Sequence, residues 1–376
     1  MCDNLRRYRS IVKSLLKLLP VEANGNFRRH LNTLAFFING IIASQSCQLP
    51  KIASKMVDHR KFESRVRLLN RWLINENIDY KFYYLPYVRT LIEGLIAMQK
   101  QLVIVFDTTA VGRSCTALVA SVVYRKRALP IAWLVRQGPK GHFSELEHEH
   151  LLHKVHELVP PKTRVIFLGD CVRLLADGEF DNSGLLKLLN SYGWLFSVRV
   201  SKNRNFCENS DVFSPKHIGV FSDGYFEIPN VAFYHHPDVG LVHLLVFWQP
   251  QPQEPIYLVP NILPVREAAY WYQKRFSIET LFSDHKSRGF QLDKSHLSEP
   301  KRLERLMIAT ALAYIWIIYL GLLAIEKNIL PHIHRSKRCD LSLFQIGLRT
   351  MDYYINQCRF PTLQLKLFYT LQESVR

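Results

Sequence analysis

The chain has 376 residues, of which 48% are hydrophobic and 22% are charged; this excludes a disordered protein and predicts more than one structural unit. A formal net charge of +17 indicates a polyanionic partner, either nucleic acid or an anionic membrane surface. Seven cysteines occur without a CxxC pair, which argues against a zinc module or a disulfide framework and favours a reducing, cytosolic setting. The basic start MCDNLRRYRS is not followed by the apolar core of a signal peptide, so export is not expected.

Residues 1–100 have the pattern of a helical region. The stretch LNTLAFFINGIIAS carries apolar residues at helical spacing, and LPKIASKM places Pro50 at a helix start. The next stretch, SRVRLLNRWL, carries Arg65, Arg67 and Arg71 on a helix. Helices with scattered arginines are typical of a DNA-binding bundle; a solvated basic face on a helical cap is the alternative.

Strand patterns begin at residue 101. In QLVIVFDTTA a short apolar run ends at Asp107, and two more β-rich runs flank the basic turn RKR, which predicts three consecutive antiparallel strands. A helix is predicted over residues 142–159, where two prolines end it. It is followed by the strand region RVIFLGDCVRLLADGEF, a helix in DNSGLLKLLNSYG and the strand WLFSVRV. The predicted order is therefore β-β-β-α-β-α-β.

Short β-like runs between turn signals predict a β-rich insertion over residues 203–262. After Pro264 an amphipathic helix is predicted in YWYQKRFSIETLFSDHK, residues 270–286. On a straight α-helix, one sector of roughly 60° would hold four polar side chains. These are Tyr272, Arg275, Glu279 and Lys286.

The stretch LMIATALAYIWIIYLGLLAI, residues 306–325, contains no charged residue. Its 20 residues are enough to span a bilayer, and the basic flank KRLER would suit a cytoplasmic loop. A helix buried on all sides within a large core has the same composition. The composition of residues 306–325 alone leaves both interpretations open.

The element order resembles a ribonuclease H-like core. In such a core the first and fourth strands pair in parallel, so acidic residues ending these strands lie side by side, and a carboxylate on a later helix can face both. Three converging carboxylates repel one another, and divalent metals relieve the repulsion because oxygen-rich sites suit Mg²⁺ or Mn²⁺. Two such ions about 3.5–4 Å apart support in-line phosphoryl transfer.

The spacing Tyr272-(2)-Arg275-(3)-Glu279-(6)-Lys286 resembles the YREK signature of DDE transposases of the insertion-sequence-four family at every gap. The resemblance continues in FDTTAVG, DGEF, KRLERLMIATALAYIW and SLFQIGLR, and covers nearly the whole chain. It implies an α/β fold: a ribonuclease H-like mixed sheet with a β-rich insertion, an N-terminal helical DNA-binding domain and C-terminal helices. The implied domains are residues 1–100 (DNA-binding), 101–202 and 263–330 (the two parts of the core), 203–262 (insertion) and 331–376 (C-terminal helices).

The resemblance implies a cut-and-paste transposase that cuts a transposon end to a 3′-OH and joins it to target DNA. Two Mg²⁺ or Mn²⁺ ions would be bound by Asp107, Asp177 and Glu279. DNA phosphates would be contacted by Tyr272, Arg275 and Lys286. The implied partners are terminal inverted-repeat DNA, target DNA and a second subunit in a homodimeric synaptic complex, in the bacterial cytoplasm at the nucleoid. The apolar stretch would then be a buried helix rather than a membrane span.

The second aspartate of the site has two candidates, Asp170 in VIFLGD and Asp177 in LLADGEF. On one continuous strand they would lie about 23 Å apart on opposite faces, so both cannot reach one pair of metals. Asp177 is preferred because GEF follows it directly and the next helix starts at the expected distance. Asp170 takes the metal if the extra residues shift the strand. If neither is well placed, the chain is a catalytically inactive, transposase-derived DNA-binding protein.

Overall fold

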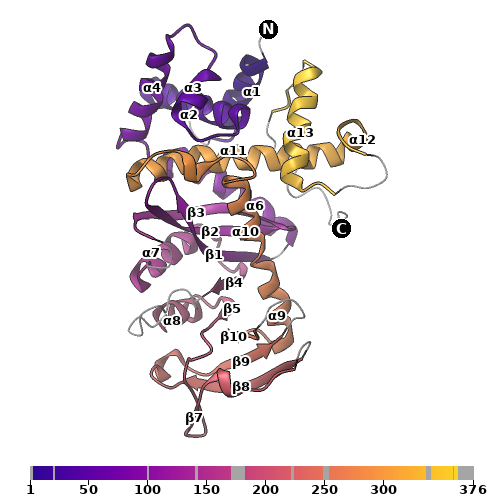
Figure 1. The fold of residues 1–376 in the computed structure, drawn as a ribbon. Helices are drawn as coiled ribbons and strands as arrows, with labels where there is room; N and C mark the ends of the chain where they lie inside the picture. Colours follow the sequence, from indigo (N-terminus) through magenta and orange to yellow (C-terminus); the bar gives the residue numbers. More distant parts are fainter. Residues whose placement is uncertain are drawn as a thin grey trace.

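The computed structural model describes residues 3–19, 22–99, 101–139, 143–170, 183–221, 224–248, 254–335, 340–358 and 360–362. N-terminal helices lie at one end, and the sheet runs from there towards the other end (Figure 1). The long helix α11 crosses between the N-terminal helices and the sheet. Strand β1 (Gln101–Val111) and helix α10 (Ser277–His285), which carry Asp107 and Glu279, therefore lie in the middle of an elongated molecule.

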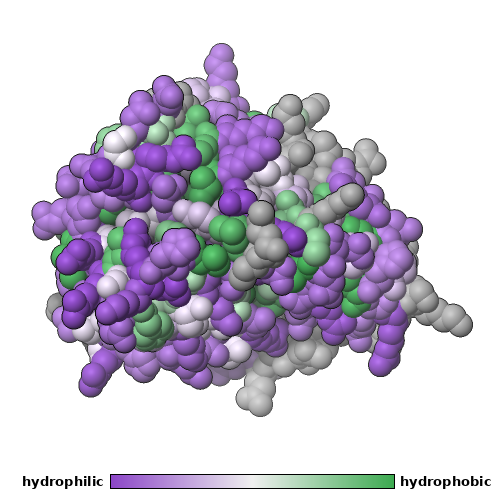
Figure 2. Space-filling model, turned by 90° about the horizontal axis from the view of Figure 1, so that it is seen from above, coloured by the Kyte–Doolittle hydropathy of each residue, from purple (hydrophilic) through white to green (hydrophobic). Residues whose placement is uncertain are grey.

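The N-terminal region is helical, as its apolar periodicity predicts. Helix α4 buries Leu69, Trp72 and Leu73 and exposes Arg67 and Arg71 on its opposite face. Seen from this end, the surface is mainly hydrophilic (Figure 2). The helices are α1 Asp3–Lys17, α2 Gly25–Ser44, α3 Leu49–Ser54, α4 Phe62–Ile74, α5 Tyr80–Tyr83 and α6 Leu85–Gln99.

The described strands form one mixed sheet in the order β3-β2-β1-β4-β5-β10-β9-β8-β6-β7. Strands β1, β2 and β3 pair antiparallel, which confirms the three predicted strands. Strand β4 pairs parallel with both β1 and β5, so the predicted parallel pairing of the first and fourth strands is also confirmed. The bounds are β1 Gln101–Val111, β2 Cys115–Tyr124, β3 Arg127–Gln137, β4 Arg164–Asp170 and β5 Leu195–Arg199.

The segment predicted as a β-rich insertion extends the same sheet. Strand β10 pairs antiparallel with β5 on one side and with β9 on the other, so the insertion strands continue from the core edge. Short 3₁₀ turns connect some of them, η2 Pro215–His217 and η3 Pro237–Val239. The strands are β6 Phe206–Glu208, β7 Asp211–Phe213, β8 Tyr225–Phe233, β9 Val242–Phe247 and β10 Ile256–Pro260.

Helices cover the sheet and follow it in the chain. The helix predicted over residues 142–159 is α7 Glu145–His156. Its N-cap residue is Ser144, because Ser144 and Glu147 form a capping box there. Helix α9 packs against β5, β9 and β10, whereas α10 packs against β1, β2 and β3. The remaining helices are α8 Ser183–Ser191, α9 Val265–Lys274, α10 Ser277–His285, η4 Leu292–Lys294, α11 Pro300–Glu326, α12 Leu330–Ile333 and α13 Leu343–Asn356.

Helix α11 is the apolar segment that is long enough to cross a bilayer. In the most apolar 18-residue stretch of α11, 94% of the residues are buried inside the protein. The helix packs against α2, α13 and β3. Close packing with α13 requires Gly347, because a Cβ there would lie 2.0 Å from the backbone oxygen of Ile317. Helix α11 is therefore a core helix, and the membrane-span interpretation of residues 306–325 is wrong.

Candidate active site

Two aspartates lie at the same level of neighbouring parallel strands. In the β1–β4 pairing Val105 is opposite Leu168, and Asp107 and Asp170 each follow two residues beyond that pair. Both side chains are nearly buried, at 10% and 8% exposed. Adjacent parallel strands bring these two carboxylates to one place, as the element order predicts. Asp170 ends β4, but β1 continues past Asp107 to Val111, so the prediction that the first strand ends at its aspartate is wrong.

The guanidinium of Arg275 lies between the carboxylates. Its Nη1 donates a hydrogen bond to Asp107 Oδ2 at 3.0 Å, and its Nη2 lies 3.9 Å from Asp170 Oδ2. The same Nη2 also donates to Oε1 of Glu279 at 3.3 Å. With its side chain only 6% exposed, Arg275 is a buried cation shared by three carboxylates.

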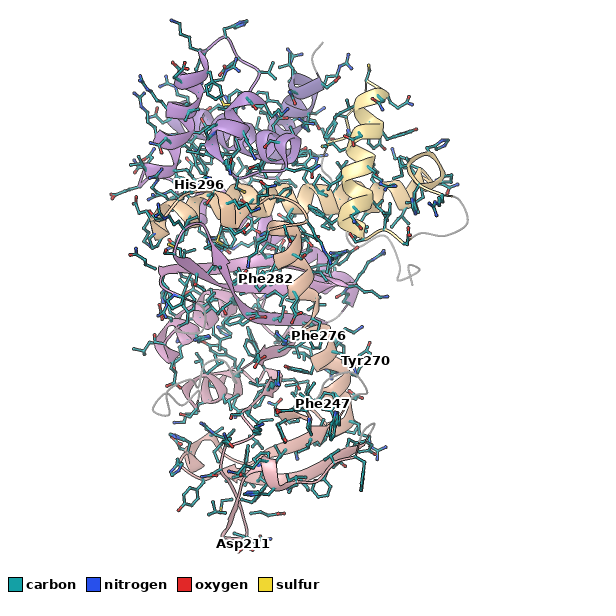
Figure 3. All side chains as sticks on the ribbon, viewed as in Figure 1. Asp211, Phe247, Tyr270, Phe276, Phe282 and His296 are labelled. Carbon is teal, nitrogen blue, oxygen red and sulfur yellow. The ribbon has the colours of Figure 1, made fainter. Side chains whose placement is uncertain are left out.

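The segment predicted as one straight helix is two helices. Helix α9 ends at Lys274 and α10 begins at Ser277, and Figure 3 labels Phe276 at this junction. Here the backbone bonds follow an i→i+3 pattern, from the N–H of Arg275 to the oxygen of Tyr272 and from the N–H of Glu279 to that of Phe276. Such 3₁₀-like turns rotate about 120° per residue instead of 100°. The prediction of a single straight helix is therefore wrong. Arg275 and Glu279 still contact each other across the junction at 3.3 Å, although Tyr272 and Arg275 are buried and Glu279 is 55% exposed.

Aromatic rings enclose the guanidinium. The Cζ atom of Arg275 lies 5.5 Å from the ring centroid of Tyr272 and 5.0 Å from that of Phe276, within cation–π range. Burial lowers the pKa of Arg275, but Tyr272 and the three carboxylates outweigh this, so the pKa is raised. Burial, followed by the charge of Asp170, raises the pKa of Tyr272 to about 12. Both groups are thus held in their usual protonated forms.

The other predicted site residues are less closely gathered. Lys286 is the C-cap residue of α10, and its side chain is half-buried. Asp177 lies outside the described residues. Among the residues that the structure describes, no three His, Cys, Asp or Glu side chains are grouped closely enough to hold a metal ion. Asp107 and Asp170 are therefore brought together, with Glu279 linked to them through Arg275.

Sequence reasoning missed Arg199. It is the last residue of β5, directly opposite Asp170 in the β4–β5 register, and its Nη1 lies 3.8 Å from Asp170 Oδ2. Its side chain is 35% exposed, so Arg199 is more accessible to solvent than Arg275, which is 6% exposed. The detectable signal was its place at the end of the strand that follows the second aspartate strand.

The donor chemistry of Asp107 and Asp170 suits a hard divalent cation. Carboxylate oxygens are the ligands that Mg²⁺ and Mn²⁺ prefer, and two carboxylates this close need positive charge between them. In this structure the guanidinium of Arg275 supplies that charge. Asp107 and Asp170 therefore fit a divalent metal site in their chemistry, at a place that already holds a cation.

One comparison with known proteins identifies a family for this chain. The family described as "Transposase DDE domain" matches residues 106–316, which is more than half of the chain. Comparison with curated proteins finds no match. A cryo-EM structure of the piggyBac transposase synaptic complex with hairpin DNA is similar at 12% identity and a TM-score of 0.44, covering 98% of this chain and 84% of that chain. By the match over residues 106–316, the chain belongs to the transposase DDE domain family.

Proposed function

We propose that this transposase performs metal-dependent cut-and-paste DNA transposition on a ribonuclease H-like core. The observation that carries the proposal is the pair Asp107 and Asp170, held at one level of two parallel strands around a shared cation. The strand order β3-β2-β1-β4-β5, in which only β2 runs opposite to the others, supports the ribonuclease H-like assignment.

The proposed chemistry has two steps. Water first hydrolyses a phosphodiester at the transposon end and leaves a 3′-OH; that 3′-OH then attacks a phosphodiester of target DNA and displaces its 3′ oxygen. Bound divalent ions would polarise the phosphate and favour both the attacking and the leaving oxygen. Asp107, the second aspartate and Glu279 would hold these ions, two Mg²⁺ or Mn²⁺. The carboxylates act by holding positive charge at the reacting phosphate.

Asp170 is the better supported second carboxylate. It ends β4 beside Asp107, and Arg275 and Arg199 both lie close to it. Asp177, which the GEF sequence favours, lies outside the described residues. We therefore propose Asp170 for the metal-binding role, and a comparison of Asp170→Asn with Asp177→Asn distinguishes the two.

DNA would be held by cations from two regions. On α4 the exposed Arg67 and Arg71 form a basic face opposite the buried one, which supports DNA binding by the N-terminal helices. Near the carboxylates, Tyr272, Arg275 and Lys286 are proposed to contact phosphates of the transposon end. Because Tyr272 and Arg275 are buried here, these contacts require Arg275 to leave the carboxylates. Two copies of the chain would pair two ends with target DNA, in the bacterial cytoplasm at the nucleoid.

The test is cleavage of a duplex that carries the element's own terminal sequence, with Mg²⁺ and purified protein. Glu279→Gln should retain the gel shift of that duplex, because the change leaves the basic surfaces intact. Nicking should fall at least about a thousandfold, the scale of one lost electrostatic contact in a transition state. Undiminished nicking by Glu279→Gln would reject the role of Glu279 as a metal ligand.

A catalytically inactive DNA-binding protein is the second candidate. It is favoured by the exposed position of Glu279 and by the lack of a three-residue metal group among the described residues. Incubating a supercoiled plasmid with wild-type protein and Mn²⁺ separates the two functions. Salt-sensitive binding without any cleavage would support the inactive protein, whereas cleavage that depends on Asp107 would support the transposase.

A further inference from the structure

The site around Arg275 gathers three carboxylates. Asp107, Asp170 and Glu279 face the guanidinium of Arg275, and Arg199 lies near Asp170 at a longer distance. Asp107 and Asp170 are nearly buried, whereas Glu279 is 55% exposed. Two buried carboxylates side by side need positive charge, which a guanidinium or a metal ion can supply.

Arg275 and a divalent ion require the same oxygen atoms. A metal ion bridging Asp107 and Asp170 has to lie within about 2.0–2.1 Å of their oxygens if it is Mg²⁺. Nη1 of Arg275 already lies 3.0 Å from Asp107 Oδ2, and its Nη2 lies 3.9 Å from Asp170 Oδ2. Two cations cannot occupy this space together, since they would repel each other at short range in a buried setting.

Arg275 lies at a helix junction. It stands between α9 and α10, where i→i+3 backbone bonds replace the regular helical pattern. Glu279, four residues further on and 55% exposed, is held to the same guanidinium. Movement of Arg275 therefore also releases Glu279 from its present partner.

We propose that Arg275 is a placeholder cation that keeps the carboxylate site closed to divalent metal until the guanidinium moves out. The proposal rests on the metal-binding role proposed above for Asp107 and Asp170. In the free protein, Arg275 neutralises the two aspartates and also binds Glu279. Metal and Arg275 then exchange at one place, so release of Arg275 to another anion, such as a DNA phosphate, raises metal affinity.

The first test measures Mn²⁺ binding by the DNA-free protein, with the signal of unbound Mn²⁺ read by electron paramagnetic resonance. We expect Arg275→Gln to bind Mn²⁺ at least tenfold more tightly than wild type, because the competing cation is gone. Arg275→Lys should lie between them, since an ammonium is a point charge that cannot span both carboxylates. Arg67→Gln removes an equal charge from the surface of α4 and should leave the affinity unchanged.

Two outcomes would overturn the proposal. Arg275→Gln could bind Mn²⁺ no more tightly than wild type, or the gain could persist in the double variant Arg275→Gln/Asp107→Asn. The melting temperature of each variant with and without Mn²⁺ shows whether it is folded. A placeholder role predicts that Mn²⁺ raises the melting temperature of Arg275→Gln more than that of wild type.

The second test uses the wild-type protein and so does not depend on a variant folding. Arginine side chains are modified with a dicarbonyl reagent and mapped by mass spectrometry across a Mn²⁺ titration. Arg275 should become more reactive as Mn²⁺ binds, whereas Arg127, buried in an ion pair with Asp284, should stay protected. Continued protection of Arg275 at saturating Mn²⁺ would contradict the exchange.

Neither measurement involves DNA cleavage. If purified protein never cuts DNA but shows the gain in Mn²⁺ affinity, the proposed transposition activity fails and the placeholder role stands. If it cuts DNA and Arg275→Gln binds Mn²⁺ as wild type does, the activity stands and the placeholder role fails. The two conclusions are therefore separable.

Discussion

Arg275 and Arg127 are both buried, and each pairs with a carboxylate on helix α10, but the number of carboxylates around them differs. Arg275 is shared by Asp107, Asp170 and Glu279. Arg127, at the start of β3, is paired with Asp284, five residues after Glu279, at 2.8 Å. The Arg127 and Asp284 side chains are 10% and 4% exposed. Arg275 therefore faces three carboxylates, whereas Arg127 is paired with the carboxylate of Asp284.

The difference separates a site that can exchange its cation from one that cannot. At Arg127 one positive and one negative charge compensate each other, so removing either leaves an isolated buried charge. At Arg275 the three carboxylates mean that another cation could replace the guanidinium and still find ligands. The solvent-exposed carboxylate of Glu279 contacts Arg275. Balanced pairs hold elements together, whereas clusters of several carboxylates mark candidate metal sites.

The largest expected effect is on cleavage at the carboxylates around Arg275. Asp170→Asn should lower the rate of DNA nicking about a thousandfold, or by about 4 kcal/mol in transition-state stabilisation. Asp177→Asn should retain most of the rate if Asp170 is the second carboxylate. Single-turnover nicking by both variants, with equal amounts of folded protein, checks this. The reverse ranking would assign the role to Asp177.

The balanced pair should respond in stability and not in metal binding. Asp284→Asn leaves Arg127 buried without its counter-charge and should lower the free energy of unfolding by about 3 kcal/mol. Replacing both residues together, Arg127→Met/Asp284→Leu, should restore most of the loss because no charge remains to be compensated. Urea denaturation measures both. A single variant as stable as wild type would show that this pair is not needed.

The pH dependence of stability sharpens the same contrast. Burial lowers the pKa of His285 to about 3, so the unfolded chain takes up its proton first and stability is lost as the pH falls below 6.5. Burial raises the pKa of Asp284 to about 6, which acts in the opposite direction between about pH 6 and pH 3.8.

His285→Phe should therefore reduce the loss of stability between pH 7 and pH 5 by roughly 2 kcal/mol. Its neighbours Tyr314 and Phe290 are aromatic and can accept a phenyl ring. Denaturation curves at the two pH values check the difference, with Asp284→Asn measured in parallel. An unchanged acid sensitivity would mean that His285 does not titrate across this range.

The smallest effect is expected at Arg199. Its side chain is 35% exposed and its Nη1 is 3.8 Å from Asp170, so water screens the interaction. Arg199→Gln should change the free energy of unfolding by less than about 1 kcal/mol. Thermal denaturation beside Arg275→Gln checks the ranking. A larger loss in Arg199→Gln would make Arg199, and not Arg275, the main counter-charge of the aspartates.

Much of the fold could be predicted because it depends on local patterns. Apolar runs between turn signals predicted the strands and the antiparallel pairing of the first three, and helical spacing predicted the N-terminal helices. The parallel pairing of the first and fourth strands was predicted from the resemblance to a ribonuclease H-like core. Strands β1 and β4 also place their aspartates at the same position in the strand. In QLVIVFD and RVIFLGD an aspartate follows six residues after the first strand residue, and this equal spacing points to Asp170.

The error at residues 270–286 has a different origin. Equal spacing on an ideal helix predicted one straight helix, but tight turns at the junction divide the segment into α9 and α10, while Arg275 and Glu279 stay in contact. Local sequence gives little warning of such a turn, because the residues are compatible with a regular helix. The burial of Arg275 against strands from distant parts of the chain accompanies the turn.

The sequence by itself determined which residues carry charge and which segments form strands and helices, and it indicated a DDE transposase. These follow from side-chain chemistry and from periodicity over a few residues. Only the tertiary structure decided that Asp170 stands beside Asp107, that Arg199 joins them, and that Arg275 occupies the space between the carboxylates. The reason is that strand register and helix packing join residues more than a hundred positions apart, and the balance of buried charge depends on those contacts.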